Sequence, residues 1–325
     1  MESGIQLGYC CINVTLRKTC NVCVNHTCRK ATFENKGLSY VSELAVKNLK
    51  NLYKILRWNA DTGFNVYRMS SDMFPWASEY KLSDLPDYEE ICSLLKDAGN
   101  IARETNQRLS FHPGPFNVLG SPNPDLVSKT INEINHHAEV MDLMNLPRSY
   151  HYPINIHCNG VYGDKKATLK RWCANYFLLS MSARNRLVIE NDDKASMYSV
   201  KDLYDNVFSS IGVPITFDYH HHRFNSGGLT EEEAFRLAAQ TWQHHNVKPL
   251  FHYSSCRKTY EDPECKAQAH ADYVYEKIRT YNNIAVDIDV EAKGKEIAVL
   301  RYHKLNEDRK LLENYVPFDE SVTTI

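Results

Sequence analysis

Histidine and carboxylate side chains gather in one short stretch of this sequence, TFDYHHHRFN at residues 216–225. Imidazole nitrogens and carboxylate oxygens together are ligands for Zn²⁺, Mn²⁺ or Fe²⁺, whereas Mg²⁺ and Ca²⁺ prefer oxygen atoms alone. Neighbouring residues point in different directions, so we expect one or two of these histidines to reach a metal. His221, three residues after Asp218, is the preferred ligand, while His220 and His222 could equally be supporting or surface residues.

Metal-capable side chains also end other apolar runs of the chain. Six runs carry such a residue as their last or next-to-last residue: His112, His157, Glu190, Asp218, His252 and Glu291. A single residue of this kind is more often a hydrogen-bonding side chain or a helix cap than a metal ligand. Six metal-capable residues, each at the end of an apolar run, instead favour a metal site. Together with the histidine triplet they exceed what one ion accepts, which indicates a polynuclear site.

The elements that would position these residues are short strands alternating with helices. Eight runs rich in Val, Ile, Phe or Tyr are typical of buried strands: 6–12, 65–69, 108–112, 153–158, 186–190, 214–218, 248–252 and 284–291. Apolar periodicity predicts helices between them at 42–59, 124–144, 229–243 and 266–281. The alternation predicts one α/β domain, a (β/α)8 TIM barrel over residues 1–305, with a doubly wound open sheet as the alternative. Residues 306–325 are predicted to form a C-terminal helix and tail.

A parallel barrel would bring the strand-end side chains together. All its strands point the same way, so their carboxyl ends meet at one face, where the active sites of such barrels lie. We therefore expect the metal site at the C-terminal ends of the strands.

Composition and charge limit the functional classes. The 325 residues carry a formal net charge of −2, so the chain lacks the overall basic field of many nucleic-acid binders, although a local basic groove stays compatible with DNA. No apolar run approaches the roughly 18–20 residues that span a bilayer, and the N-terminus does not resemble a secretion signal. Ten cysteines are too sparse for a disulfide scaffold. We expect an intracellular protein with reduced thiols and no membrane association.

One cysteine-rich segment, CNVCVNHTC at residues 20–28, carries four potential zinc ligands: Cys20, Cys23, His26 and Cys28. Structural zinc modules usually pair two well-separated half-sites, whereas these ligands all lie within nine residues. A loop without metal is therefore the favoured interpretation, and a structural zinc is the alternative.

Several longer stretches resemble one family, the UV damage endonucleases. They are LGYCCINVTLR (7–17), ILRWNADTGFNVYRMSSDMFPWAS (55–78), QRLSFHPGPFNVLGSPNP (107–124), LVIENDD (187–193), TFDYHHHRFN (216–225) and VEAKGKE (290–296). The resemblance implies a barrel fold like that of endonuclease IV, with a trinuclear metal centre. It also implies an enzyme that nicks double-stranded DNA on the 5′ side of cyclobutane pyrimidine dimers, 6-4 photoproducts and abasic sites. Such an enzyme leaves a 3′-hydroxyl and a 5′-phosphate.

Position by position, the resemblance implies these metal ligands: His112, His157, Glu190, Asp218, His221, His252, His270 and Glu291. His270 is the one ligand that the strand ends and the histidine triplet do not suggest, and it lies in a predicted helix. The expected catalytic residues are Glu190, Asp218, His252 and Glu291. Divalent ions held there would acidify a water that attacks the phosphorus. We expect two or three ions, with Mn²⁺ favoured and Zn²⁺ or Mg²⁺ as alternatives.

The resemblance also implies where DNA is contacted. Tyr9 and Asn13 match positions near the lesion or the scissile phosphate. After HPG the family often has Gln-Tyr, which probes the damaged bases; here the pair is Pro115-Phe116. Phe116 keeps an aromatic ring that can wedge or stack, but Pro115 cannot donate hydrogen bonds, so lesion preference is expected to differ. Candidates for phosphate contacts are Arg17, Arg68, Arg223, Arg257 and Lys293.

Two further departures from the family bear on the third metal position. Glu79 stands where members commonly have a histidine. Leu250 stands where some members have a lysine, and Lys248 lies two residues earlier.

Two other functions are compatible with these residues. A metal-dependent sugar isomerase of the barrel type would use similar ligands, two metals and a polar sugar pocket, without an aromatic wedge. An inactive damaged-DNA-binding protein would have lost activity through the changes at Pro115 and Glu79. The HPGPF loop argues against the isomerase, and the retained ligand positions argue against the inactive binder. Damaged double-stranded DNA is therefore the expected partner, with no obligate protein partner.

Overall fold

A computed structural model describes residues 4–307, and its strands follow the predicted order. The strands are β1 (Ile5–Cys10), β2 (Val66–Arg68), β3 (Arg108–Ser110), β4 (Ile154–His157), β5 (Leu187–Glu190), β6 (Ile215–Thr216), β7 (Leu250–Tyr253) and β8 (Val286–Val290). Each overlaps one of the predicted strand segments. Most strand residues are buried whichever face they point to, because helices cover the outside of the sheets.

All strand pairings are parallel. A five-stranded sheet has the order β3-β2-β1-β8-β7, and a three-stranded sheet has the order β4-β5-β6. Single parallel bridges join the two sheets, between Phe111 and Ile154 at one junction and between Asp218 and His252 at the other. The protein therefore has an α/β fold with parallel sheets, as the alternation of strands and helices predicts.

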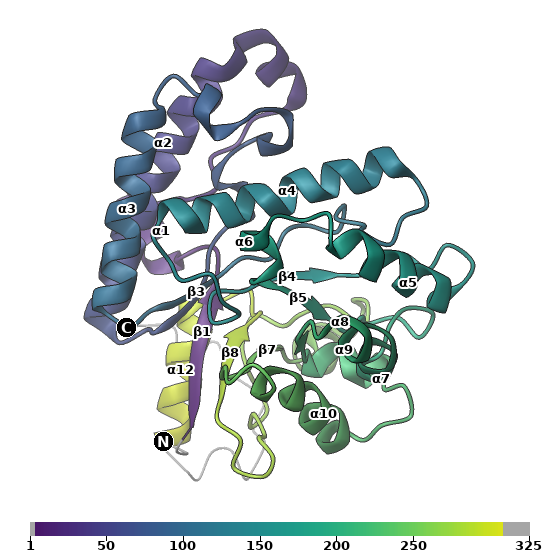
Figure 1. The fold of residues 1–325 in the computed structure, drawn as a ribbon. Coiled ribbons are helices and arrows are strands. Elements are labelled where there is room, and N and C mark those ends of the chain that lie inside the picture. Colours follow the sequence, from purple (N-terminus) through teal and green to yellow (C-terminus); the bar gives the residue numbers. More distant parts are fainter. Residues whose placement is uncertain (1–3, 308–325) are drawn as a thin grey trace.

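Twelve α-helices accompany the strands in the described residues. They are α1 (Val14–Cys20), α2 (Lys30–Thr62), α3 (Tyr88–Glu104), α4 (Pro124–Leu143), α5 (Lys165–Tyr176), α6 (Met181–Arg184), α7 (Val200–Leu203), α8 (Ser209–Ile211), α9 (Tyr219–Phe224), α10 (Glu231–Gln243), α11 (Arg257–Tyr260) and α12 (Glu296–Glu307). The shorter turns are η1 (Ser71–Met73), η2 (Ala77–Glu79), η3 (Leu82–Asp84) and the π-helical η4 (Tyr204–Phe208). Figure 1 shows the strands at the centre with the long helices around them. Within residues 4–307, no helix has the length and apolar character needed to cross a membrane.

Three of the four predicted helices are confirmed, as parts of α2, α4 and α10. α4 begins with Pro124 behind Asn123, whose side chain accepts a hydrogen bond from the Asp125 N–H at 2.9 Å. α10 begins after Thr230, which forms the predicted capping box with Glu233. Helix starts are thus encoded by the local polar residues.

The helix predicted at 266–281 is wrong, because this segment is irregular throughout. Several of its backbone amides bond to residues outside the segment instead of to their own turn. Ala271 N–H donates to the Ser255 carbonyl at 3.0 Å, and Ile278 N–H donates to the Tyr302 hydroxyl at 3.0 Å. Tertiary partners therefore replace the intrahelical bonds that the apolar periodicity suggested.

Charged side chains fill the interior near the amino ends of β3, β7 and β8. Arg108 donates to Asp287 at 2.9 Å, and Lys248 lies 2.5 Å from the same carboxylate. Leu250 is buried on β7 between Lys248 and His252. Lys248 therefore pairs with Asp287 near the amino end of β7, whereas His252 lies near its carboxyl end. The position two residues before His252 is occupied by the apolar Leu250.

The C-terminal part of the described chain is α12, which is anchored at its first residue. The Glu296 carboxylate accepts hydrogen bonds from the N–H groups of Val14 and Thr15 at 2.9 and 2.6 Å. The predicted boundary at residue 305 falls inside α12, and the predicted tail beyond residue 307 lies outside the described residues.

Candidate metal centre

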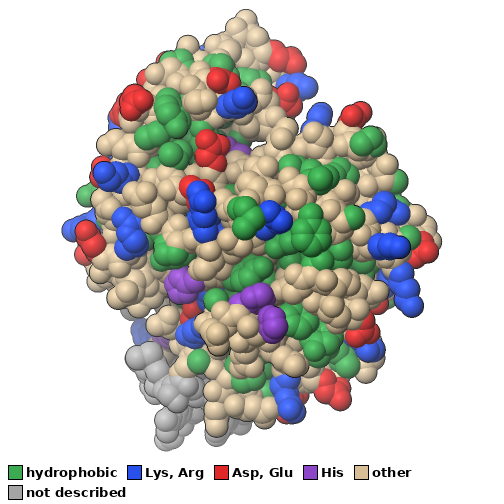
Figure 2. Space-filling view, viewed as in Figure 1, with side chains coloured by type: hydrophobic (Ala, Val, Ile, Leu, Met, Phe, Trp, Pro, Cys, Tyr) green, Lys and Arg blue, Asp and Glu red, His purple; other side chains and the backbone are tan. Residues whose placement is uncertain are grey.

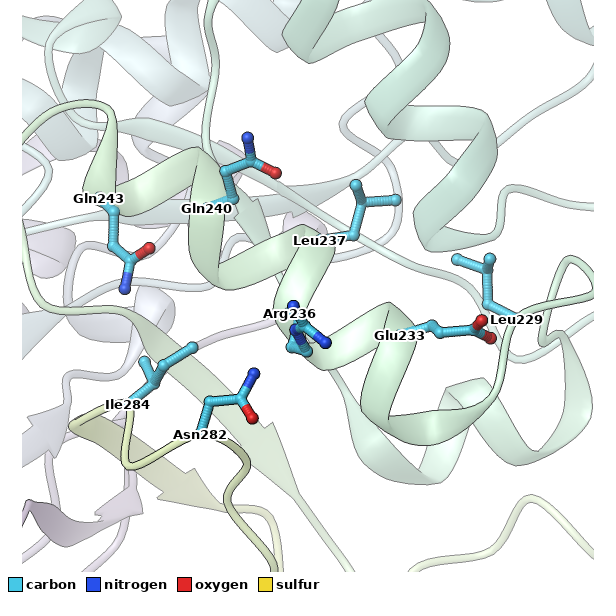
Figure 3. Close-up of a pocket in the computed structure, with 8 residues that line it drawn as sticks. All are labelled: Leu229, Glu233, Arg236, Leu237, Gln240, Gln243, Asn282 and Ile284. Atoms are coloured by element: carbon cyan, nitrogen blue, oxygen red, sulfur yellow. The ribbon is translucent and has the colours of Figure 1, made fainter.

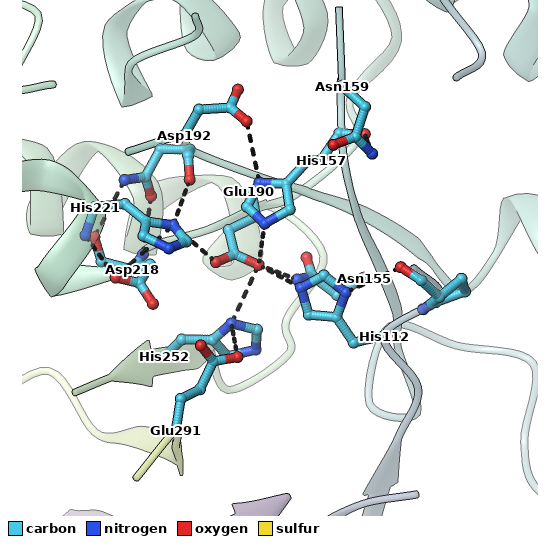
Figure 4. A network of polar contacts seen from close by, with 12 residues as sticks. His112, Asn155, His157, Asn159, Glu190, Asp192, Asp218, His221, His252 and Glu291 are labelled. Carbon is cyan, nitrogen blue, oxygen red and sulfur yellow. Dashed lines mark hydrogen bonds and ion pairs between the residues drawn. The ribbon is translucent and has the colours of Figure 1, made fainter. Parts of the chain in front are cut away.

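Histidine and carboxylate side chains from the carboxyl ends of the strands meet in one cluster (Figure 4). Three groups in it could each hold a cation, because their ligand atoms lie within 4.8 Å of one another. The groups are His112, His252 and Glu291; His112, His157 and Glu190; and Glu190, Asp218 and His221. The structure thus brings together all the predicted ligands except His270, and the groups share His112 and Glu190.

Glu190 lies at the centre of the cluster and is fully buried at the end of β5. Its Oε2 atom lies 3.0 Å from His112 Nε2, 3.1 Å from His252 Nδ1 and 3.6 Å from His157 Nε2. Its Oε1 atom lies 3.2 Å from His221 Nδ1. A carboxylate that faces several imidazoles in this way could bridge cations bound between them.

The charges in the cluster are strongly coupled. Burial alone would raise the pKa of Glu190, but the imidazoles of His252 and His157 hold that pKa well below its ordinary value. Burial would lower the pKa of His252, yet Glu190 and Glu291 raise it to about 9. The carboxylates are therefore ionised at neutral pH, and their negative charge favours a cation at this place.

Strand pairing and one helix cap explain how these side chains converge. In the parallel register of β4 and β5, His157 lies directly beside Glu190. Asp218 is the N-cap of α9, and its carboxylate accepts a hydrogen bond from the His221 N–H at 2.7 Å. This cap fixes the position of His221, which follows Asp218 by three residues. The bridge to β7 places Asp218 beside His252.

Two imidazoles have an oxygen atom close to their outer nitrogen. His112 Nδ1 lies 3.3 Å from the Pro113 carbonyl oxygen, and His157 Nδ1 lies 3.3 Å from Asp192 Oδ1. In both rings Nε2 is the nitrogen that faces Glu190. An acceptor on one nitrogen fixes the tautomer and leaves the other nitrogen free for a metal.

Sequence reasoning missed three polar residues that support the cluster. Asn155 donates a hydrogen bond to Glu190, and Asn191 accepts one from the Asp218 N–H at 2.8 Å. Asp192 faces the imidazole at the end of β4. Two signals could have found them: Asn155 lies two residues before the end of β4 and so shares its face, and Asn191 and Asp192 directly follow Glu190.

Arg68 is placed differently from the phosphate contact that was predicted. Its side chain is only 13% exposed, and its guanidinium pairs with Glu291 Oε1 inside the cluster. The same Glu291 oxygen lies 3.5 Å from His252 Nδ1. Arg68 therefore holds a candidate metal ligand, and its predicted contact with a DNA phosphate stays a prediction.

Unpaired polar atoms provide a test of whether a metal fits here. Glu190 Oε1, Asp218 Oδ2 and His252 Nδ1 are buried without a hydrogen-bond partner in the described part of the chain. Leaving a buried polar group unsatisfied costs roughly 1–3 kcal/mol, and more for a charged one. A divalent cation would compensate all three atoms, and the mixture of imidazole and carboxylate suits Mn²⁺, Zn²⁺ or Fe²⁺. The residues present therefore fit a divalent metal.

Three other histidines named in the sequence analysis, His270, His220 and His222, belong to none of the three groups. His270 belongs to none of the three groups; its Nδ1 lies 3.0 Å from the Glu291 backbone oxygen and 3.5 Å from Glu291 Oε2. Its side chain is 27% exposed at the edge of the cluster, and its role as a ligand stays a prediction. His220 and His222 are buried, so neither is a surface residue.

Tyr9 and Asn13 are buried in this structure, and their predicted role near the lesion or the scissile phosphate stays a prediction. Tyr9 is fully buried on β1, and its hydroxyl donates to Asn59 Oδ1 of α2 at 2.6 Å. Asn13 donates to the Tyr9 hydroxyl at 2.9 Å and caps α1 by accepting from the Leu16 N–H. The side-chain alternation of β1 turns Tyr9 toward the helices, because only every second residue faces the interior.

The loop after β3 presents its predicted substrate-contacting residues to solvent. Pro115 and Phe116 are both exposed, and the Phe116 side chain is 90% exposed. Figure 2 shows histidine side chains at the surface beside hydrophobic and basic side chains. A phenylalanine this exposed gains little from folding, so its place four residues after His112 favours a binding role.

The other predicted phosphate contacts fall into two classes. Arg17 and Lys293 are exposed. Arg223 pairs with Glu276 at 2.6 Å, and Arg257 lies 3.8 and 3.6 Å from two aspartates. Arg17 and Lys293 are therefore more accessible to a DNA phosphate than Arg223 and Arg257.

Two other candidate positions lie apart from the cluster. Glu79 is exposed at the end of η2 and belongs to none of the three groups. In the segment 20–28, His26 Nδ1 lies 2.9 Å from Asn48 Oδ1, and Cys23 Sγ lies 2.8 Å from Asn25 Oδ1. Hydrogen bonds to asparagines therefore organise this segment.

Two cavities lie elsewhere on the molecule. One of about 490 Å³ is bounded by α10 together with Asn282 and Ile284 (Figure 3). Another of about 820 Å³ is lined by tyrosines and charged residues, among them Tyr253 and Arg223. Neither is lined by a member of the three ligand groups, so neither marks the place where a substrate would meet the metal cluster.

Comparison with known proteins identifies the family. The family model described as UV-endonuclease UvdE matches residues 5–319. The chain belongs to this family. A UV-damage endonuclease of Schizosaccharomyces pombe is 33% identical over 302 residues, which cover 90% of this chain and 49% of that protein. This UvdE chain thus spans about half the length of that relative.

One solved structure supports the same assignment. The crystal structure of SacUVDE matches the UvdE chain with a TM-score of 0.80 and 29% identity, over 94% of this chain and 99% of that one. A 3-keto-D-glucoside 4-epimerase from E. coli matches with a TM-score of 0.53 but only 9% identity, over 94% of this chain and 100% of the epimerase. The second likeness concerns the fold alone.

Proposed function

We propose that this UvdE protein is a divalent-metal-dependent DNA repair endonuclease. It nicks the phosphodiester bond on the 5′ side of cyclobutane pyrimidine dimers and 6-4 photoproducts, and also cleaves at abasic sites. The observation that carries the proposal is the Glu190-centred cluster in a chain of the UV-endonuclease family. A sugar isomerase is disfavoured, because the likeness to epimerases stops at the fold.

We propose further that the two parallel sheets close into one eight-stranded barrel. The single bridges at Phe111–Ile154 and Asp218–His252 support closure at both junctions. In a closed barrel the carboxyl ends form one ring, which is the arrangement that a shared metal site requires.

The proposed reaction is hydrolysis of the P–O3′ bond, which yields a 3′-hydroxyl and a 5′-phosphate. When bound, divalent cations would supply Lewis acidity toward the phosphate and acidify a water at neutral pH. Glu190, Asp218, His252 and Glu291 would hold these cations, with His112, His157 and His221 completing the three groups. We propose His270, 3.5 Å from Glu291 Oε2, as a further ligand at the edge of the cluster. Glu291, which is fixed by Arg68, would orient the attacking water toward the phosphorus.

The shared ligands support a proposal on the number of ions. Three overlapping groups are compatible with two or three ions, since His112 and Glu190 each belong to two groups. We propose Mn²⁺ as the working metal, with Zn²⁺ or Mg²⁺ as alternatives.

Lesion recognition is proposed to use the exposed Phe116. Photoproducts weaken stacking and pairing, which makes the duplex easier to bend or open at the lesion. The Phe116 ring could fill the space of a displaced base, while Pro115 stiffens the loop without donating a hydrogen bond.

The test is nicking of UV-irradiated supercoiled plasmid, with Mn²⁺ and with EDTA, beside undamaged and abasic-site plasmids. We expect Mn²⁺-dependent nicking of irradiated and abasic plasmids that is lost in Glu190→Gln. The exposed Glu104→Gln variant of α3 is the control and should stay active. Tight binding to irradiated DNA without nicking would contradict the proposal and favour a damage sensor.

A further inference from the structure

We propose that the loop between β4 and α5 is a second DNA-contacting element, in which Tyr162 stacks on an unpaired base next to the cleavage site. Lys166 and Lys170, in the first turns of α5, would contact the neighbouring phosphates. This inference rests on the proposed function, because it takes damaged DNA as the ligand. We call residues 158–170 the Tyr162 element.

Tyr162 has a backbone conformation that bulky residues rarely adopt. Its φ angle is 47°, in the left-handed region, and the same loop holds Asn159 at 57° and Gly163 at 82°. Strained residues of this kind persist where the surrounding structure holds them, and they cluster at binding and catalytic sites. Here the strain keeps an aromatic ring at the surface, since Tyr162 is 43% exposed.

The ring is supported from beneath. A Cβ atom at Gly160 would come within 2.6 Å of the Tyr162 ring, so the ring lies directly across the Gly160 backbone. The Tyr198 hydroxyl anchors that backbone by donating to the Gly160 carbonyl at 2.8 Å. The Arg171 guanidinium lies 5.9 Å from the ring centroid. A ring held in this way loses little conformational freedom when it binds a base.

The element lies beside both the metal cluster and the exposed Phe116. It directly follows His157, a member of the Glu190-centred groups. Asn159 Nδ2 donates to the Asn117 carbonyl at 3.2 Å, which ties this loop to the loop that carries Phe116. Two exposed aromatic rings are therefore held on adjoining loops at one edge of the cluster.

Positive charge follows the ring along α5. Lys166 and Lys170 are both exposed and lie one helical turn apart, so they share a face. Asp164 caps the helix by accepting from the Ala167 N–H at 3.0 Å. A local basic surface is needed for DNA in a chain whose net charge is −2.

An aromatic ring beside lysines fits a nucleic-acid strand with at least one unstacked base. Every base has a π-face, so stacking tolerates any sequence, as an enzyme that acts on many lesion contexts requires. The duplex at a photoproduct offers such a base at low cost.

The test is binding and nicking of a duplex with one cyclobutane dimer. The dissociation constant is measured by fluorescence anisotropy in EDTA, and KM and kcat are measured by nicking with Mn²⁺. Tyr162→Asn removes the ring but suits the left-handed backbone, so its effect does not come from backbone strain. We expect about tenfold weaker binding and a higher KM, with kcat within about twofold of wild type. Tyr162→Phe should match wild type.

Charge is tested separately with Lys166→Ala/Lys170→Ala. We expect the slope of log affinity against log salt concentration to fall in magnitude by about 2, one for each lost phosphate contact. The controls are Tyr53→Ala and Lys47→Ala/Lys54→Ala, exposed residues of α2 that should change neither quantity.

Unchanged binding by Tyr162→Asn, alongside a wild-type protein that binds and nicks, would overturn this inference and leave the proposed function intact. A wild-type protein that neither binds nor nicks would overturn the proposed function itself.

Discussion

Glu190 is the residue around which the metal centre is arranged. It is buried, it faces imidazoles on both carboxylate oxygens, and one of those oxygens has no hydrogen-bond partner among the described residues. An ionised carboxylate in that position is costly unless a positive charge compensates it. The imidazole of His252, with its pKa raised to about 9, compensates part of this charge, and a bound cation would take over that role.

Asp192 is expected to tune the metal affinity through His157. Asp192→Asn weakens the acceptor on His157 Nδ1 without touching the metal, so we expect Mn²⁺ affinity to fall about 10- to 100-fold. Isothermal titration calorimetry measures this change, and the less buried Asp193→Asn is the matched control. Equal Mn²⁺ affinity in Asp192→Asn and wild type would show that His157 is not oriented in this way.

The strand-end residues could be chosen from the sequence because each stands at a change from apolar to polar residues. Asp218 and His252 are examples, and a parallel arrangement of strands is enough to bring them together. The supporting residues could not be chosen in this way. Whether Arg68 faces a phosphate or Glu291 depends on which strands are neighbours, and β2 and β8 are far apart in the chain.

At the scale of elements, local signals predict helices well where the helix caps itself. The Thr230–Glu233 box lies entirely within four residues and correctly marks the start of α10. The segment 266–281 has a similar apolar period, but its amides bond to residues such as Ser255 and Tyr302. The local sequence of a segment does not reveal that its backbone amides will bond to residues of other segments.

The α10 cap should contribute to stability but not to the reaction. Thr230→Ala removes the hydroxyl that accepts from the Glu233 N–H, so we expect a loss of about 1 kcal/mol in the free energy of unfolding. Urea denaturation measures the loss, and nicking activity should be unchanged. Thr230→Ser keeps the hydroxyl and should stay close to wild type; equal destabilisation by both variants would contradict the capping argument.

At the scale of the whole molecule, metal binding and folding are linked. The ligands come from strands in both sheets, so an ion would join parts of the chain that single bridges otherwise connect. A ligand present at 100 times its dissociation constant stabilises a protein by about 2.7 kcal/mol.

We therefore expect Mn²⁺ to raise the melting temperature of wild-type protein and EDTA to reverse the rise. Differential scanning calorimetry provides the comparison. Glu190→Gln should show little or no rise, because its central carboxylate is lost. A rise of equal size in Glu190→Gln would place the stabilising ion elsewhere in the molecule.

The most direct test of the central claim is incision of a labelled duplex that contains one cyclobutane dimer, with the product resolved at single-nucleotide length. The proposed function predicts Mn²⁺-dependent incision on the 5′ side of the dimer, with a 3′-hydroxyl that a polymerase can extend. No incision in the presence of Mn²⁺, or incision at positions unrelated to the dimer, would contradict it.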